Sequence, residues 1–346
     1  MSVPDYCRTT GAALQEQQSA VSPLRQYMLL SALTVLLVIS VLLALSSGSV
    51  SVPLSSVWQQ LHNPTPGIEQ QILWDLRLPR AMAALVTGGL LALSGVIMQV
   101  LLRNPLADPY ILGVSGGAAV GALAVILLGV ASIWITQAAF AGALLSVFVV
   151  FGLAGRQQWS ATRLLLTGVV VSAGWGAVIN VMLTTSNGNN VQSMLFWLMG
   201  DLSQSRTGSW HFVLLLAGLL LMLSQARALN ALARGELVAA ALGVNVPRLK
   251  LILYFTAAML TATAVTVAGS VGFVGLVIPH MLRLLGARDH RWLLPCSVLL
   301  GSSFLLLADT LARTIVAPQQ LPVGVLTAMI GVPAFLFILH RGARLP

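Results

Sequence analysis

Charged residues are scarce in this sequence. Asp, Glu, Lys and Arg make up 8% of its 346 residues, whereas hydrophobic residues make up 57%. A soluble domain carries about 25% charged residues, so the composition excludes an ordinary soluble domain and predicts a polytopic membrane protein. The apolar runs are continuous and do not alternate, and backbone in lipid must satisfy its own hydrogen bonds. We therefore expect an all-α protein and not a β-barrel.

Acidic residues are the scarcest charged class. The sequence has 9 Asp and Glu against 18 Lys and Arg, which gives a net charge of +9. The basic residues stand singly between apolar runs, without a basic stripe or interleaved aromatics, so the charge does not indicate nucleic-acid binding. No relay of acids crosses several helices, as a proton-coupled pump would require. The charge-poor interior also argues against a bare ion as cargo.

Cysteines and the common catalytic motifs are few or absent. Cys7 and Cys296 lie far apart, so we expect neither a disulfide nor a metal site. No Walker A pattern is present to hold ATP phosphates, and neither GxSxG nor HExxH occurs. The sequence thus predicts no catalytic site and no cofactor in this chain. An integral-membrane enzyme would need a clustered catalytic constellation, and an ion-coupled secondary transporter is the alternative class that stays open.

Long apolar runs dominate what the sequence does have. At about 20 residues per crossing, they predict ten membrane helices within residues 26–346, after a polar cytoplasmic tail at residues 1–25. The first run is too long for a signal-peptide core and lacks a convincing cleavage pattern, so we expect an uncleaved helix. The expected crossings are about 26–46, 81–102, 110–130, 137–155, 163–184, 208–226, 249–268, 272–286, 293–313 and 322–340.

Basic residues orient these helices. With the N-terminus inside, 14 Lys and Arg lie on the inner side, and four lie on the outer side: Arg77, Arg80, Arg206 and Arg313. By the positive-inside rule, this asymmetry predicts that both termini are cytoplasmic.

The outer arginines are unexpected under that rule. Arg77 and Arg80 flank Pro79, which fits a helix start, where a positive charge opposes the helix dipole. They would either extend to lipid headgroups or form a docking pair for an acidic partner outside. Arg313 follows Asp309 by four residues, so the two could pair on one helix face. Asp309 is also the one acid expected inside a membrane helix, which makes it a functional candidate.

The stretch Ala228–Lys250 is too polar to lie in lipid. Gly235 and Glu236 resemble a helix start, and Gly243 resembles a helix stop. We expect a short helix held in the cytoplasm, where a soluble partner could move the bundle. An ordinary solvated loop is the alternative.

Two stretches predict a sharp turn and a packing seam. The motif RNPLADP at residues 103–109 contains two prolines and should break the chain sharply on the inner side. Gly113, Gly117 and Gly121 follow with the spacing that lets two helices approach closely.

Two polar features remain open. Residues 269–279, rich in glycine and ending in Pro279, should form the turn between the seventh and eighth helices, and we expect His280 to be a hydrogen-bonded packing residue. Hydroxyl and amide side chains on the fifth helix would line a mildly polar path or form interhelical hydrogen bonds. They are Thr167, Ser172, Asn180, Thr184 and Thr185.

Ten motifs in order carry a family resemblance. They are RLPR (Arg77–Arg80), LSGVIMQ (Leu93–Gln99), RNPLADP (Arg103–Pro109), ILGVSGGA (Ile111–Ala118), FWLMG (Phe196–Gly200), GE..A..LG (Gly235–Gly243), GFVGLVIPH (Gly272–His280), DHRWLLP (Asp289–Pro295), ADTLAR (Ala308–Arg313) and LPVGVLTA (Leu321–Ala328). With them, the chain resembles the permease subunits of type II ABC importers, which carry iron–siderophore complexes, haem and vitamin B12. The resemblance runs from about Arg77 to His340.

The resemblance implies an assembly in a bacterial inner membrane. It consists of a homodimer of ten-helix subunits embedded in lipid, two cytoplasmic ABC ATPase subunits that hold ATP and Mg, and a periplasmic substrate-binding protein. Alternating access would move the cargo along the dimer axis. A ferric siderophore or haem is the expected cargo, and cobalamin is the alternative.

The resemblance also assigns roles to residues. Docking of the binding protein would use Arg77, Arg80 and Arg313. The segment that couples to the ATPase would include Arg234, Gly235, Glu236, Ala239, Leu242 and Gly243. The cytoplasmic gate would use Asn104, Leu106, Ala161 and Thr162, the last two placed before the fifth helix. Ala161 departs from the hydroxyl residue of the cobalamin relative, which leaves the gate lining and the cargo open.

Overall fold

The structure is a computed structural model that describes residues 23–48, 50–154, 160–203, 205 and 207–342. Within these residues every regular element is helical, which confirms the all-α prediction. Most of the predicted tail, residues 1–22, lies outside the described residues, and the first helix begins at Pro23.

Each of the ten predicted crossings coincides with a helix. The ten are α2 (Pro23–Ser46), α5 (Leu78–Leu101), α6 (Val114–Leu127), α7 (Trp134–Ala154), α8 (Ala161–Thr185), α10 (Ser209–Ser224), α13 (Val246–Ala268), α14 (Val274–Leu284), α15 (His290–Thr314) and α16 (Val323–Gly342). Shorter elements connect them: α3 (Leu54–His62), α4 (Ile68–Gln71), η1 (Ile72–Arg77), η2 (Pro109–Leu112), α9 (Gly188–Met199), α11 (Ala226–Ala233) and α12 (Glu236–Ala241).

Not all ten helices are full-length spans. In the described part of the chain, six helices are long and apolar enough to cross a bilayer, or seven if α10 and α11, bent by 64°, form one span. The apolar helices α6, α14 and α16 are shorter. The third and eighth predicted crossings are therefore too long, because hydropathy does not detect the turns that shorten α6 and α14.

Two prolines that were expected to mark a helix start or the end of a turn lie inside helices. The second crossing does not start near residue 81, because α4, η1 and α5 run as one helix from Ile68 to Leu101. Proline lacks an N–H and clashes with the preceding turn, and the π-helical turn η1 directly before Pro79 provides the wider geometry that accommodates it. Pro279 likewise lies within α14, whose preceding turn ends at Phe273 with φ 68°.

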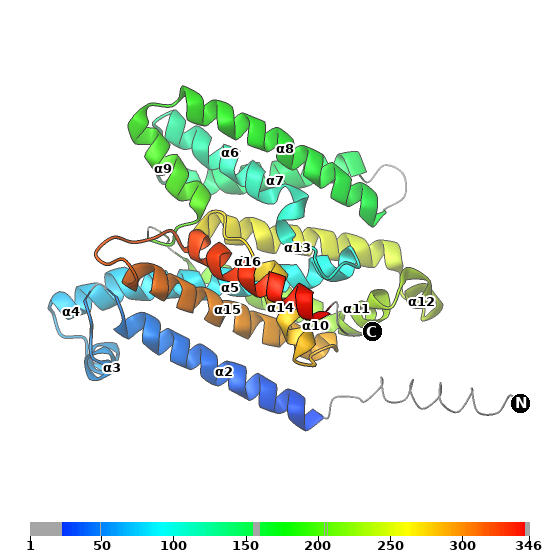
Figure 1. The fold of residues 1–346 in the computed structure, drawn as a ribbon, viewed down its shortest axis with the longest axis horizontal. Helices are drawn as coiled ribbons and strands as arrows, with labels where there is room; N and C mark the ends of the chain where they lie inside the picture. The colour runs from blue at the N-terminus through cyan, green and yellow to red at the C-terminus, as the bar shows by residue number, and fades with distance from the viewer. Residues whose placement is uncertain (1–22, 49, 155–159, 204, 206, 343–346) are drawn as a thin grey trace, which may run out of the picture.

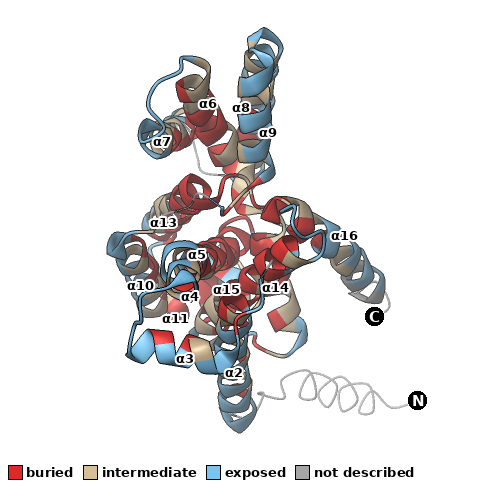
Figure 2. Ribbon diagram, turned by 90° about the vertical axis from the view of Figure 1, so that its left-hand side faces the viewer, coloured by how far each residue is buried: buried red, intermediate tan, exposed pale blue. Residues whose placement is uncertain are grey.

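The central helix is α5, which is buried along nearly its whole length between α13, α14 and α15 (Figure 2). Small residues permit this packing. A Cβ at Gly88 would lie 2.3 Å from the Gly301 carbonyl oxygen, and one at Gly95 would lie 2.0 Å from that of Gly275. Backbones this close leave no room for side chains, so α5 is the scaffold around which the other helices pack.

A second layer, α6 to α9, stacks on α13 and leaves one helix uncovered (Figure 1). The predicted glycine seam joins α6 to α7, because a Cβ at Gly117 would lie 2.3 Å from the Gly142 oxygen, and Gly121 meets Ala138 similarly. Gly113 instead precedes α6, with φ 70°. Only 11% of the most apolar window of α8 is buried, and the helix lies at the edge of the molecule in Figure 2.

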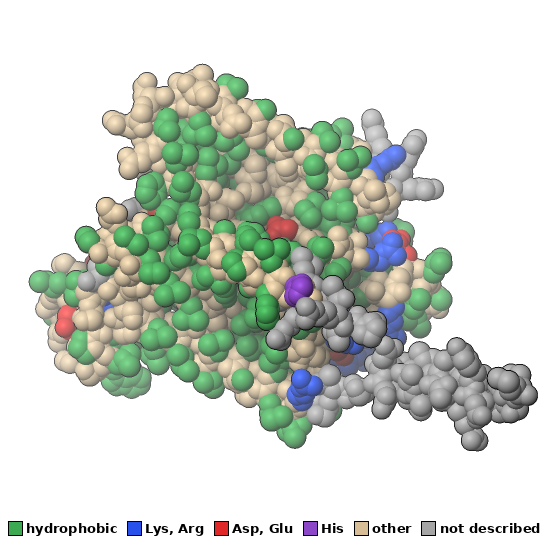
Figure 3. All heavy atoms as spheres, in the orientation of Figure 1, with side chains coloured by type: hydrophobic (Ala, Val, Ile, Leu, Met, Phe, Trp, Pro, Cys, Tyr) green, Lys and Arg blue, Asp and Glu red, His purple; other side chains and the backbone are tan. Residues whose placement is uncertain are grey.

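The bundle has two chemically different ends. One carries Arg80, at the N-terminal end of α5, and is called the Arg80 end. The other carries Glu236, the first residue of α12, and is called the Glu236 end (Figure 1). On the face shown in Figure 3, Lys and Arg side chains gather toward the Glu236 end.

Candidate functional site

The predicted outer arginines form a buried ion cluster at the Arg80 end. The Arg80 Nε lies 2.8 and 3.0 Å from the two carboxylate oxygens of Asp309, and the Arg313 Nε lies 3.1 Å from Asp309 Oδ2. The side chains of Arg80, Asp309 and Arg313 are 7%, 2% and 7% exposed. The predicted pair of Asp309 and Arg313 is therefore confirmed. The second partner, Arg80, comes from another helix.

Arg77 and Arg313 cap the C-terminal end of α2. Arg77 donates to the carbonyl oxygens of Leu45 (2.6 Å), Ser46 (2.8 Å) and Val50, and Arg313 donates to that of Ala44 (3.1 Å). The last carbonyls of a helix have no partner inside the helix, and cations are favourable at that end. The expected conflict with the dipole is thus relieved for Arg77, which lies at the C-terminus of α2, whereas the charge of Arg80 is balanced by Asp309.

The same cluster has an excess of positive charge. Two arginines, Arg80 and Arg313, pair with the single carboxylate of Asp309, and Arg77 binds the backbone carbonyls at the end of α2 nearby. The Arg80 Nη1 donates to Gln320 at 2.6 Å, but the buried Nη2 has no hydrogen-bond partner within the described residues. All three arginines are at most 7% exposed, so none extends freely to headgroups, and the lipid-anchoring alternative is wrong.

The polar segment 228–250 contains three helical pieces. The end of α11 leads to Gly235 (φ 130°), α12 spans Glu236–Ala241, and Gly243 (φ 79°) precedes α13. The predicted start and stop are confirmed, although the segment is not one helix. Arg234 ends α11 and is exposed.

The short helix α12 has two different faces. Ala239 is fully buried, whereas the side chains of Leu237 and Leu242 are 89% and 66% exposed. The two leucines therefore leave apolar surface of α12 open to solvent or to a partner.

Glu236 connects α12 to two other elements. Its Oε2 lies 2.7 Å from the Lys250 Nζ on α13, and its Oε1 lies 3.4 Å from the Arg103 Nη2 in the turn after α5. The three side chains of Glu236, Lys250 and Arg103 are 37%, 8% and 46% exposed. These contacts join residues far apart in the sequence, and no local sequence pattern points to them.

The predicted gate residues lie on two elements. Asn104 and Leu106 lie in the turn after α5, where the Asn104 Oδ1 accepts the Leu106 N–H at 2.9 Å. Ala161 and Thr162 are expected before the fifth helix, but they form the first turn of α8. Ser160 is the actual N-cap, because its side chain accepts the N–H of Arg163.

A second contact at the Glu236 end fastens α11 to α15. Asn230 donates to the Asp289 carboxylate at 2.8 Å and accepts the backbone N–H of His290 at 3.0 Å. Partial burial alone would raise the pKa of Asp289. Its hydrogen bonds to the Arg291 N–H and to Asn230, with the nearby charges of Arg291 and His290, bring that pKa below its ordinary value.

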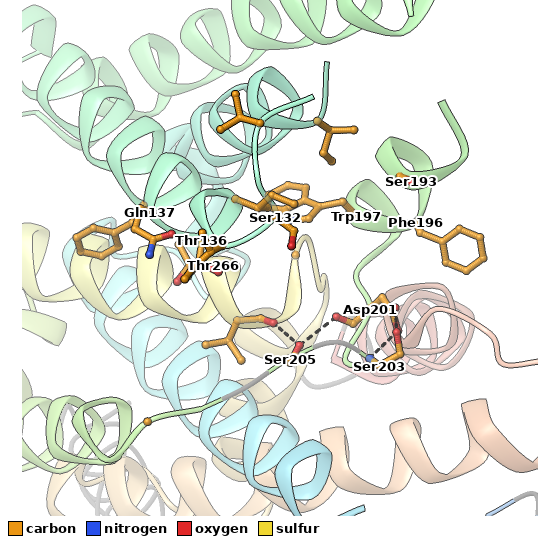
Figure 4. Close-up of a pocket in the computed structure, with 18 of the residues that line it drawn as sticks. Ser132, Thr136, Gln137, Ser193, Phe196, Trp197, Asp201, Ser203, Ser205 and Thr266 are labelled. Carbon is orange, nitrogen blue, oxygen red and sulfur yellow. Dashed lines mark hydrogen bonds between the residues drawn. The ribbon is translucent and has the colours of Figure 1, made fainter. Parts of the chain in front are cut away.

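A cavity of about 1400 Å³ opens at the Arg80 end (Figure 4). Residues from α7, α9, α10 and α13 and from the described connection between α9 and α10 line it, among them Gln137, Trp197, Asp201, Ser205 and Thr266. Figure 4 shows Asp201 hydrogen-bonded to Ser203 and Ser205 beneath the ring of Trp197. The lining of the cavity thus combines polar and aromatic side chains.

The predicted polar path on α8 does not line this cavity. The hydroxyls of Thr184 and Thr185 donate to carbonyls of α8 itself, at 2.9 and 2.8 Å, so they form no interhelical hydrogen bond. At His280, the expected packing hydrogen bond is missing at Nδ1, which is buried without a partner in the described chain.

These observations define a class of protein. A charge-poor bundle of membrane helices, with a short polar-flanked helix at one end and a cavity lined by polar and aromatic side chains at the other, is typical of a membrane transport protein. The profile of the FecCD transport family matches residues 36–341. The chain belongs to that family and is an ABC importer permease, a multi-pass membrane protein.

Individual relatives agree with this assignment. The cobalamin import system permease protein of Halobacterium salinarum is 44% identical over 282 residues, which cover 80% of this chain and 75% of that protein. The hemin transport system permease protein of Yersinia pestis is 41% identical and covers 88% and 94%. A solved metal-chelate type ABC transporter in an inward-facing conformation matches with a TM-score of 0.79 at 33% identity, over 90% of this chain and 98% of that one.

Proposed function

We propose that this chain is the permease subunit that moves an iron chelate, a ferric siderophore or haem, into a bacterial cytoplasm by alternating access. The observation that carries the proposal is the match, at a TM-score of 0.79, to a metal-chelate type transporter. The 41% identity to a hemin permease supports it. The 44% identity to a cobalamin permease keeps cobalamin as the second candidate.

Uptake into proteoliposomes tests the cargo. The permease is reconstituted with its ATPase and binding protein, and ferric siderophore, haem and cobalamin are supplied in parallel. ATP-dependent accumulation of one of the iron chelates is the expected result, and accumulation of cobalamin alone would reassign the cargo. Uptake by vesicles without the ATPase would instead identify an ion-coupled secondary transporter.

The proposed orientation places the Glu236 end in the cytoplasm of a cell with an inner membrane, together with both termini. The gathering of Lys and Arg toward that end supports it. In a background without Cys7 and Cys296, Asn63→Cys in the connection after α3 should react with a membrane-impermeant maleimide added outside whole cells. Arg288→Cys at the opposite end should react only after permeabilisation, and the reverse pattern would overturn the orientation.

We further propose that two copies of the permease pair through α8. The exposure of nearly all of α8, including the polar side chain of Asn180, supports the pairing, because a polar side chain that faces lipid is costly and is favoured where another helix covers it. Val170→Cys should form a disulfide with its copy in the other subunit. Leu153→Cys, equally exposed on α7, is the matched control. Failure at every position tried along α8 would count against the pairing.

The proposed ATPase contact is the exposed face of α12. Two ABC ATPase subunits would hold ATP and Mg and supply all the chemistry, and this permease would need no cofactor or catalytic site. Closure of the ATPases would push on α12 and shift the bundle between two packings. Leu237→Arg should abolish the stimulation of ATP hydrolysis by the permease while the permease stays folded. Normal stimulation would mean that α12 is only a loop.

Docking of the binding protein is proposed at the Arg80 end. The carboxylate of Asp309 is paired with two arginines and so leaves an excess positive charge there, and the Arg80 Nη2 has no hydrogen-bond partner among the described residues. Such a field attracts acidic side chains even when its source is mostly buried. Arg80→Gln should weaken binding of the binding protein, most strongly at low salt, whereas Asp75→Asn on the exposed surface should not. Unchanged affinity of a folded Arg80→Gln permease would refute docking here.

A further inference from the structure

We propose that Glu236 is a positioning residue that connects α12 to the turn at Arg103–Leu106, so that movement of α12 is transmitted to the predicted gate. The inference rests on the proposed function, in which α12 receives the motion of the ATPase. It gives Glu236 a role inside the permease and not at the ATPase surface.

One carboxylate joins three elements. Glu236 is the first residue of α12, and its two oxygens contact different cations, Lys250 on α13 at 2.7 Å and Arg103 at 3.4 Å. Lys250 is 8% exposed and lies in the first turns of a long helix that packs on α5. It anchors the carboxylate, and the second oxygen is then held toward Arg103.

The glycines that bound α12 allow this short helix to change its tilt. Glycines with positive φ, Gly235 and Gly243, bound the six residues of α12. No atom lies within 4 Å of a Cβ built at either glycine, so the space around both ends is open. A short helix between two glycines in open space can tilt relative to α11 and α13, with the buried Ala239 and the contact to Lys250 as its pivot.

The turn that receives the contact is compact. Arg103 has φ 49°, in the left-handed region that a residue other than glycine rarely adopts. Asn104 closes the turn, because its N–H donates to the Gln99 oxygen at 3.1 Å, and its own backbone oxygen accepts the Ala107 N–H at 3.1 Å. A force on the Arg103 side chain therefore acts on Asn104 and Leu106 together.

The two faces of α12 separate the two roles. Leu237 and Leu242 point outward, where an ATPase would bind, whereas Ala239 is buried. Glu236 is 37% exposed, and both of its oxygens already have partners within the permease. When an ATPase displaces α12 through Leu237 and Leu242, Glu236 moves with the helix. Its contact with Arg103 then transmits the movement to the turn at Arg103–Leu106.

The test uses the complete reconstituted importer and measures ATP hydrolysed per cargo molecule transported. Glu236→Gln and Arg103→Met should each raise this ratio by about fivefold or more, the lower end of measured coupling factors. The double variant should match the single variants, because both remove one contact.

Arg103→Lys, which keeps a cation, should restore most of the coupling. Arg248→Met, at an exposed cation near the start of α13, is the matched control and should leave the ratio unchanged.

Two further measurements distinguish a failure of the inference from a loss of ATPase binding or of folding. Affinity of the permease for the ATPase and the thermal unfolding midpoint should be unchanged in all these variants. If Glu236→Gln weakens ATPase binding while Arg103→Met has no effect, Glu236 is an ATPase contact and the inference is wrong, although α12 remains the coupling helix. An unchanged ratio with intact binding also overturns it. Normal stimulation by Leu237→Arg would refute the proposed ATPase contact at α12, on which this inference rests. If the Glu236→Gln variant does not fold, the Arg103 variants still test the inference. The Arg103 side chain is 46% exposed, so its replacement should leave the permease folded.

Discussion

Each end of the permease contains a cluster of one carboxylate and two cations, and the two clusters differ in how deeply the carboxylate is buried. In each, one carboxylate lies between two cations from separate elements: Asp309 between Arg80 and Arg313, and Glu236 between Arg103 and Lys250. The carboxylate of Asp309 is 2% exposed, whereas that of Glu236 is 37% exposed. Breaking a buried cluster leaves uncompensated charge, while a half-exposed contact can open to water at little cost. The two clusters therefore indicate an anchored end and a movable end.

The largest expected effect is at the buried carboxylate. Asp309→Asn leaves the guanidiniums of Arg80 and Arg313 without a counterion and should lower the free energy of unfolding by about 3–5 kcal/mol. Thermal and denaturant unfolding of the purified permease in detergent measures this. Asp75→Asn, which removes an exposed acid, is the control and should change stability by less than about 0.5 kcal/mol. Equal effects of the two substitutions would remove the distinction between the ends.

Arg77→Lys should have the next largest effect. A single ammonium cannot serve the carbonyl oxygens of Leu45, Ser46 and Val50 with the geometry of a guanidinium, so a loss of about 2 kcal/mol in stability is expected. The charge is kept, so affinity for the binding protein should stay the same. A drop in that affinity without loss of stability would show that Arg77 contacts the partner directly.

Asn230→Ala should weaken the fixed part of the Glu236 end. It removes the contacts from α11 to Asp289 and His290 and should cost about 1–2 kcal/mol in unfolding free energy. The pKa of Asp289 is lowered in the folded state, so its contribution is present above about pH 4 and is lost as the pH falls through the folded-state pKa. Unfolding measured between pH 7 and pH 3 should therefore show a smaller decrease in the variant than in the unchanged protein.

Arg103→Met should have the smallest effect on stability. The pair with Glu236 is 3.4 Å long and about half exposed, so a loss of at most about 1 kcal/mol is expected, with a large change in coupling. Unfolding and the ATP-to-cargo ratio are measured on the same preparation. A loss of stability comparable to that of Asp309→Asn would mean that both clusters are anchors and that the two ends do not differ.

Much of the fold follows from the sequence, because hydropathy and turn residues act locally. All ten predicted crossings fall on helices, and Gly235 and Gly243 bound α12 as expected. The failures are at positions where tertiary packing overrides local preference. The helix through Pro79 begins at Ile68, because a π-helical turn accommodates the proline. Local signals do not reveal such a turn.

The candidate sites show the same division. The distribution of basic residues along the chain singles out Arg77, Arg80 and Arg313, together with Arg206, which lies outside the described residues. It does not identify their surroundings, because Arg80 and Asp309 are 229 residues apart in sequence and meet only when α5 packs on α15. The family resemblance points to Glu236, but the contacts of this residue with Arg103 and Lys250 depend on how three elements converge.

The sequence alone thus determined that the protein is helical and crosses the membrane several times, and its ordered motifs indicated the permease family. These properties follow from composition and local spacing, which need no knowledge of neighbours. Tertiary structure decided which charges are buried, which are half exposed and which helix face is left uncovered. The reason is physical, because the effect of a charge depends on how much water its neighbours exclude, and packing alone sets that.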